Sequence, residues 1–186
     1  NYRSDAEPCP VICFQDIQGG GKSTIGEKLC ENPKFKKAEQ DEFYGHSPSC
    51  QSWIEINARK KNGPDVIFVT RCNANPNHYN KYLQMLNSTP SLVYFITPDR
   101  MDVVSVMTSI QGVIVRSSGG DKFMVGREEH PIGKTLEIIL STFNSIEKHR
   151  NAITFNKFND ISPELVAEME DVFKKGPDAI IEYVTS

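Results

Sequence analysis

The residues whose types and spacing point most directly to chemistry are a glycine run closed by a lysine and a serine. Backbone N–H groups of consecutive glycines can approach phosphate oxygens closely, because no Cβ intervenes. The lysine adds positive charge at the β and γ phosphates of a nucleoside triphosphate, and the serine hydroxyl is a ligand suited to Mg²⁺. The predicted nucleotide-binding residues are Gln18, Gly19, Gly20, Gly21, Lys22, Ser23 and Thr24, with Lys22 also catalytic and Ser23 as the metal ligand.

The flanking sequence supports a phosphate-binding loop. Val11–Phe14 is a short apolar run typical of a buried strand, and Ile25 and Leu29 have the i, i+4 spacing of a helix. A strand, a glycine loop and a helix in this order are the context that a P-loop requires. Asp16 stands where the usual pattern has its first glycine. Aspartate tolerates a left-handed backbone, so the turn can survive the change, and the alternative is that the carboxylate has another task. The alternative for the loop as a whole is a purely structural role, as a glycine-rich turn that binds no ligand.

Apolar strands alternate with helical segments along the rest of the chain. This order predicts an α/β fold of the P-loop NTPase or kinase type, with a central parallel sheet of about five strands flanked by helices, and a lid. Expected strands cover residues 11–14, 35–41, 65–70, 91–96 and 153–155, and residues 180–184 are expected as an added edge strand. Expected helices cover residues 25–30, 49–61, 76–86, 98–110, 132–149 and 162–175.

In a parallel sheet, ligands bind beyond the carboxyl ends of the strands. Asp41 follows the second expected strand, where a carboxylate could accept the proton of an attacking hydroxyl. The alternative for Asp41 is a structural role, as the cap of a turn before Phe43. Arg71 follows the third strand and could clamp an anionic substrate, or simply form a surface ion pair.

Residues 116–131 change character and predict a mobile lid. Ser117–Lys122 is loop-like, and Arg116 and Arg127 flank the segment. An arginine that closes over the γ phosphate can stabilise transition-state charge, so either of these two is a candidate catalytic residue. A solvated loop arginine is the alternative for each, and His130 is a further loop residue that could touch nucleotide or substrate.

The segment after the last expected strand is a candidate for base contact. Asn156, Lys157, Phe158 and Asn159 partly match the Asn-Lys-x-Asp sequence with which GTPases read guanine, with Asn159 in place of the deciding aspartate. Asn156 and Lys157 are therefore predicted nucleotide-binding residues. The choice between ATP and GTP stays open.

Length and composition set the broad class. The chain has 186 residues, enough for one domain with a sheet covered on both faces. Its start at Asn1 rather than Met suggests a single domain, 1–186, excised from a larger protein.

The five cysteines form no CxxC pair, which favours a reducing compartment such as the cytoplasm or nucleus, and no segment predicts a membrane span or secretory signal. The net charge of −3 argues against a broadly basic nucleic-acid surface, so any polynucleotide must be held by a local patch.

The short motifs together resemble the polynucleotide kinase domain of fungal-type tRNA ligases and, more distantly, the phage-type 5′-hydroxyl polynucleotide kinases. The likeness is carried by Gly19–Thr24, Gln40-Asp41, Val69–Asn75 and Arg127–His130, and it follows the order of elements over most of the chain. The resemblance implies transfer of the γ phosphate of ATP or GTP to the 5′-hydroxyl of RNA with Mg²⁺, in RNA repair or tRNA splicing. It also implies fusion to ligase and phosphodiesterase domains. Asp41 would be the general base and Arg71 would contact a substrate phosphate, although Thr70 replaces the aspartate that precedes this arginine in the family.

Two other classes stay open at this point. A small-molecule kinase of the nucleoside or shikimate type would have the same loop and a lid. A GTPase-like nucleotide-binding module would not transfer phosphate to a second substrate, and the lack of an Asp-x-x-Gly sequence after the third strand argues against it.

Overall fold

The chain forms two compact units in this computed structural model, which describes residues 8–43, 47–77, 80, 84, 93–116, 122–125, 128–157 and 161–186. The first unit comprises the residues up to Asp16, Lys22–Thr97 and Glu147–Ile153. The second comprises Ile17–Gly21, Pro98–Ile146 and Thr154–Ser186. The chain therefore enters the second unit at the glycine run and returns to the first at Lys22.

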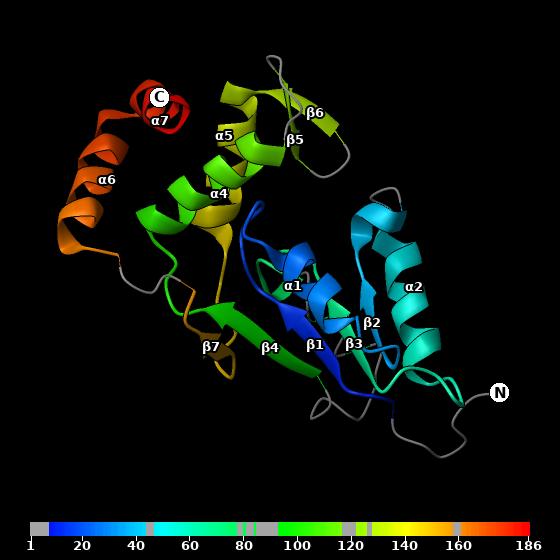
Figure 1. Cartoon of the computed structure of the whole chain (residues 1–186). Helices are drawn as coiled ribbons and strands as arrows, with labels where there is room; N and C mark the ends of the chain where they lie inside the picture. Colours follow the sequence, from blue (N-terminus) through cyan, green and yellow to red (C-terminus); the bar gives the residue numbers. More distant parts are fainter. Residues whose placement is uncertain are drawn as a thin grey trace. The chain divides into compact units, whose positions relative to one another are not determined.

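The structure contains a five-stranded sheet with the strand order β2-β3-β1-β4-β7 (Figure 1). The pairs β1–β3, β1–β4 and β2–β3 are parallel. Helices flank the sheet, so the predicted α/β fold with a parallel five-stranded sheet is confirmed. The strands are β1 (Val11–Phe14), β2 (Phe35–Ala38), β3 (Val66–Val69), β4 (Val93–Pro98) and β7 (Ile153–Phe155).

In the first unit, two helices cover opposite faces of the sheet. Successive side chains of a strand point to opposite faces. On β2, Lys37 pairs with Glu27 of α1 (Lys22–Leu29), whereas Lys36 lines a pocket with residues of α2 (Ser47–Ala58). A short 3-10 helix, η1 (Gln40–Phe43), follows β2. The apolar core of this unit includes Val11, Cys13, Ile54, Ile67 and Phe95, all at most 2% exposed.

The second unit has its own core. Its members include Ile17, Met107, Ile110, Leu136 and Ile139, each at most 2% exposed. The elements of this unit are α4 (Val103–Arg116), the antiparallel strands β5 (Lys122–Val125) and β6 (Glu128–Pro131), and the helices α5 (Ile132–Ser145), α6 (Pro163–Lys175) and α7 (Pro177–Thr185).

The predicted start of α6 is confirmed. Ser162 accepts a hydrogen bond from Leu165 N–H at 3.2 Å, and Pro163 occupies the first turn. Both are favoured at a helix N-terminus, because the hydroxyl satisfies a free N–H and proline has none to satisfy. Gly176, with φ +103°, ends the helix as predicted.

The prediction of an edge strand at residues 180–184 was wrong, because this segment belongs to α7. Pro177 occupies its first turn, and Ile180 and Val184 are buried four positions apart while Glu182 between them is exposed. A spacing of four fits both periodicities, and packing against the second core selects the helix.

The helix expected at 98–110 starts later and ends later. Pro98 ends β4, and α4 begins at Val103, after Asp102, whose carboxylate accepts the N–H of Val104 at 3.0 Å. This cap defines the helix start more strongly than the proline does. Arg116 is consequently the last residue of a helix rather than the first residue of a loop.

The predicted lid contains regular structure. In β5 and β6, Phe123 lies opposite His130 and Met124 opposite Glu129, within the segment predicted to be a mobile lid. The run Phe-Met-Val is rich in residues favoured in strands. Arg127 and residues 117–121 lie outside the described residues, as does most of the helix expected at 76–86.

Candidate active site: the phosphate loop and the residues around Ser23

The backbone of the glycine run requires glycine at two positions. Gly19 and Gly21 have φ values of +73° and +92°, in the left-handed region that side chains disfavour. A Cβ on Gly19 would also lie 2.5 Å from the carbonyl oxygen of Ser109, whereas one on Gly21 would meet nothing within 4 Å. Gly19 is thus constrained by both conformation and space, and Gly21 by conformation alone.

Within the second unit, the loop is anchored to two helices. The Ser109 hydroxyl of α4 donates a hydrogen bond to the carbonyl oxygen of Gln18. The side-chain amide of Gln18 donates to Thr142 Oγ1 of α5 at 2.7 Å. Gly112 also packs so closely that a Cβ there would lie 2.9 Å from the carbonyl oxygen of Gly19. These contacts fix the backbone that would face phosphate.

Lys22 is the first residue of α1, and its side chain contacts Asp16 of the same unit. Its side chain is buried, and Nζ donates a hydrogen bond to the carbonyl oxygen of Asp16 at 3.2 Å. Asp16 is 3% exposed and has no positive φ; among the described non-glycine residues only Asn62 and Asn73 do. Of the two possibilities left open for Asp16, the left-handed turn is not observed, because the loop makes its left-handed turns at Gly19 and Gly21.

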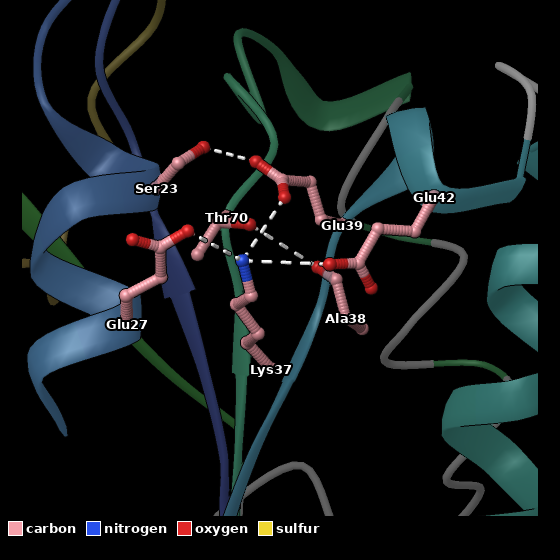
Figure 2. A network of polar contacts seen from close by, with 7 residues as sticks. All are labelled: Ser23, Glu27, Lys37, Ala38, Glu39, Glu42 and Thr70. Atoms are coloured by element: carbon pink, nitrogen blue, oxygen red, sulfur yellow. Dashed lines mark hydrogen bonds and ion pairs between the residues drawn. The ribbon is translucent and has the colours of Figure 1, made fainter. Parts of the chain in front are cut away.

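Ser23 joins a polar cluster at the carboxyl end of β2 (Figure 2). Its hydroxyl donates a hydrogen bond to a carboxylate oxygen of Glu39, the first residue after the strand. The second oxygen of Glu39 accepts a hydrogen bond from Lys37 Nζ at 3.2 Å. Lys37 Nζ also lies 3.5 Å from a carboxylate oxygen of Glu27 and 3.4 Å from one of Glu42.

The lysine at the centre of this cluster has Glu39 as its least exposed acidic partner. The side chains of Lys37 and Glu39 are each only 17% exposed, whereas those of Glu27 and Glu42 are 69% and 51% exposed. Burial acts to lower the pKa of Lys37, but the hydrogen bonds and charges of Glu39 and Glu42 outweigh it and raise that pKa above its ordinary value. The partly buried pair is therefore the firm contact, and the two exposed ones are screened by water.

The donor set around Ser23 fits a magnesium ion. Mg²⁺ prefers oxygen ligands and is commonly held by one or two protein groups together with substrate phosphates. Ser23 and Glu39 place a hydroxyl and a carboxylate oxygen side by side next to the phosphate loop. Among the described residues, no group of three or more histidine, cysteine, aspartate or glutamate side chains forms a site held by protein alone.

A buried amide network in the first unit centres on Gln15, the residue that follows β1. Gln15, which is 1% exposed, donates to the carbonyl oxygens of Asn73 and Glu147, each at 3.1 Å, and accepts from His149 N–H at 2.9 Å. Asn73 in turn donates to the carbonyl oxygens of Phe14 at 2.7 Å and Arg71 at 3.2 Å. The network ties together the ends of β1 and β3 and the segment after α5.

Arg71 follows β3 by two residues, in agreement with its predicted position after the third strand. Burial raises the pKa of the Cys13 and Cys50 thiols, while the positive charge of Arg71 acts against the rise at both. The electrostatic effect of Arg71 therefore reaches Cys13 of β1 and Cys50 of α2. All five cysteines are free thiols.

The other predicted residues fall in several places. Asp41 is the second residue of η1, three positions beyond the end of β2 rather than at the end of a strand, and its side chain lies outside the described set. Thr24 is exposed on α1, and His130 of β6 has Nε2 3.6 Å from a carboxylate oxygen of Glu128. Asn156 and Lys157 follow β7 in the second unit, where Lys157 N–H donates to Asp99 Oδ1 at 3.3 Å. Asn159 is outside the described residues.

Glu39 and Lys37 are the residues that the sequence analysis missed. A signal was available, because a carboxylate directly after a parallel strand lies at the ligand-binding edge of the sheet. The sequence placed the strand end at Asp41, so Glu39 was assigned to the strand interior.

Comparison with known proteins finds similar solved structures but no similar sequences. No protein-family model matches the sequence, and no curated protein matches it. Among solved structures, a gluconokinase from Sinorhizobium meliloti 1021 aligns with a TM-score of 0.50 and 13% identity over 96% of this chain and 95% of that one. A fungal RNA kinase aligns with a TM-score of 0.51 and 11% identity over 96% of both chains.

At these identities the likeness shows the fold alone. The chain has the α/β fold of P-loop kinases, with its glycine loop between β1 and α1 as that fold requires. Among the helices in the described part of the chain, none combines the length and apolar character needed to cross a membrane.

Proposed function

We propose that this chain is a phosphotransferase that moves the γ phosphate of ATP or GTP to the 5′-hydroxyl of RNA. The observation that carries the proposal is the hydrogen bond from Ser23 to Glu39, which sets a carboxylate beside the serine of a phosphate loop. The polynucleotide acceptor is supported by the segments Gln40-Asp41 and Val69–Asn75 and by the shared fold of a fungal RNA kinase.

The loop residues would hold the donor. Backbone N–H groups of the glycine run and the positive end of α1 would face the phosphates, and Lys22 would turn from the Asp16 carbonyl to the β and γ phosphates. Ser23 and Glu39 would hold Mg²⁺, which supplies charge neutralisation at the phosphates when bound. Asn156 and Lys157 would contact the base.

The acceptor residues would complete the reaction. The 5′-hydroxyl oxygen forms a bond to the γ phosphorus, the bond between that phosphorus and the β–γ bridging oxygen breaks, and the nucleoside diphosphate leaves. Asp41 would take the hydroxyl proton as general base. Arg71 would bind a phosphate of the RNA, and Arg116 or Arg127 would stabilise the charge of the transferring group.

A small-molecule kinase is the second candidate, because the fold matches a gluconokinase about as well as it matches the RNA kinase.

We further propose that residues 1–186 act as one kinase domain of a longer intracellular RNA-repair protein with ligase and phosphodiesterase domains.

An acceptor competition separates the candidates. The protein is offered a γ-labelled nucleotide with Mg²⁺ and an equimolar mixture of 5′-hydroxyl RNA, nucleosides and gluconate. The proposal predicts label on the RNA and its loss in Asp41→Asn and Lys22→Ala. Label on a small molecule would transfer the assignment to the second candidate, and full RNA labelling by Asp41→Asn would remove the base assignment alone.

A further inference from the structure

A pocket with three lysines and the protein's single tryptophan lies in the first unit, away from the phosphate loop. It has a volume of about 520 Å³ and is lined by Lys34, Lys36, Trp53, Asn57 and Lys60, together with Pro33, Asn62, Gly63, Pro64 and Asp65. This volume is in the range of small-ligand sites. The proposed kinase chemistry uses none of these residues.

The pocket lies at the amino ends of β2 and β3, whereas Glu39, the partner of Ser23, directly follows the carboxyl end of β2. Lys34 directly precedes β2, and Asp65 directly precedes β3, so both mark the amino ends of their strands. The phosphate loop follows the carboxyl end of β1, which runs parallel to β3. The pocket and the Ser23–Glu39 contact therefore lie at opposite ends of β2, whose four residues span about 13 Å.

The charge of the pocket is unusual for this chain. The described residues that line it include three lysines and one carboxylate, that of Asp65, although the whole protein has a net charge of −3. Lys34 and Lys36 are exposed, and the structure gives neither an ion pair with any described residue. A local excess of positive charge favours an anionic ligand.

The tryptophan adds an aromatic surface to these cations. Trp53 is partly buried, and its ring lies 6.3 Å from that of Phe43, so its position is fixed by the core. Asn57, one turn further along α2, donates a hydrogen bond to the carbonyl oxygen of Trp53 at 2.8 Å and lines the same pocket. Lysines beside a fixed aromatic ring are the combination with which proteins bind single-stranded nucleic acid, with phosphates on the cations and a base on the ring.

We infer that this pocket binds a segment of single-stranded RNA, with one base against Trp53 and backbone phosphates against Lys34 and Lys36. The inference extends the proposed function, because it gives the RNA a second contact point away from its 5′ end. It does not depend on phosphate transfer and can hold or fail separately from it.

The test uses Trp53 as its own reporter, since it is the only tryptophan in the chain. A 5′-phosphorylated RNA octamer, which has no acceptor hydroxyl at its 5′ end, is titrated into the protein while tryptophan fluorescence is recorded. We expect saturable quenching. The Lys34→Gln/Lys36→Gln variant should bind about tenfold more weakly, and the slope of log affinity against log salt should fall by about 1.4, or about 0.7 for each lost phosphate contact.

Two controls decide the meaning of the result. Lys174→Gln/Lys175→Gln removes the same charge from two exposed lysines of α6 and should bind as the wild type does. A nucleoside monophosphate should bind far more weakly than the octamer. Octamer binding without a fluorescence change, equal weakening by both double variants, or equal affinity for the monophosphate would each overturn the inference.

The same variants separate this inference from the proposed function. Lys34→Gln/Lys36→Gln should raise KM for a long 5′-hydroxyl RNA and leave kcat unchanged. If quenching and the lysine effect are observed but no acceptor is phosphorylated, the kinase proposal fails and the binding site stands.

Discussion

The hydroxyl of Ser23 and the carboxylate of Glu39 are joined by a hydrogen bond, although 16 positions separate them in the sequence. Ser23 lies in the first turn of α1 and Glu39 directly follows β2, so packing of the helix against the sheet brings them together. Lys37, on the same strand, fixes the other oxygen of that carboxylate.

Glu39→Gln should therefore slow the proposed phosphate transfer without unfolding the protein. The amide keeps the shape of the side chain but removes the charge that Ser23 and Lys37 contact. We expect kcat to fall about 10- to 100-fold and the Mg²⁺ concentration for half-maximal rate to rise. Kinetics over a range of Mg²⁺ concentrations check this.

The matched control is Glu42→Gln, which removes a carboxylate from the same lysine but not from Ser23. Its side chain is 51% exposed, so we expect rates within about twofold of the wild type. Similar losses in both variants would mean that the charge of the cluster, and not the Ser23 contact, is what matters.

Gly19→Ala should cost more stability than Gly21→Ala. Both changes impose a side chain on a left-handed backbone, but only the first places a Cβ 2.5 Å from the Ser109 carbonyl oxygen. We expect a loss of at least about 2 kcal/mol for Gly19→Ala and about 1 kcal/mol for Gly21→Ala. Denaturant titration measures both.

Gly133→Ala provides the reference for these glycine changes. It lies in α5 with open space around it and no positive φ, so alanine should be neutral or slightly stabilising. If Gly19→Ala is as well tolerated as this substitution, the close approach of α4 to the loop is not the constraint that we describe.

Gln15→Leu should destabilise the first unit strongly. The substitution retains bulk but leaves two carbonyl oxygens and one N–H without the partners that Gln15 provides. We expect a loss of about 2–4 kcal/mol, whereas the same change at the exposed Gln111 should stay within about 0.5 kcal/mol. Equal effects at the two sites would contradict the role of the buried network.

His149 should make stability depend on pH in the mildly acidic range. Burial and the charge of Arg150 lower the pKa of His149, whose ring stacks on Phe95 with centroids 4.2 Å apart and whose Nδ1 accepts a hydrogen bond from Asn151 N–H. The unfolded chain therefore binds the proton more readily. This site's contribution is full above the unfolded pKa of about 6.5 and is lost as pH falls from there towards the lower folded pKa.

His149→Phe tests this dependence, because it keeps an aromatic ring against Phe95 and removes the titrating group. The free energy of unfolding, measured between pH 8 and pH 5, should fall less steeply in the variant than in the wild type. Parallel curves would show that another group produces the slope.

The sequence predicts the local parts of this fold better than the contacts between them. The phosphate loop and the start of α6 are encoded by neighbouring residues, the glycines before Lys22 and the Ser162-Pro163 cap, and the structure has both. The C-terminal helix was misread because Ile180 and Val184 fit either periodicity, and only the packing of α7 decides.

The candidate site shows the same limit. Lys22 and Ser23 follow from a motif, whereas Glu39 depends on where β2 ends and on which of Lys36 and Lys37 faces α1. Only the correct end of β2, at Ala38, distinguishes Glu39 from Glu42. Asp16 replaces a glycine without needing its conformation, because Gly19 and Gly21 make the turns.

The most direct test of the central claim is end-specific labelling. Wild-type protein, Lys22→Ala and Glu39→Gln are incubated with Mg²⁺, γ-labelled ATP or GTP, and one RNA sequence bearing either a 5′-hydroxyl or a 5′-phosphate. We predict that the wild type labels only the 5′-hydroxyl RNA, that Lys22→Ala labels neither, and that Glu39→Gln labels it slowly. Failure of the wild type to label the 5′-hydroxyl RNA with either nucleotide, or equal labelling of both RNAs, would contradict the account.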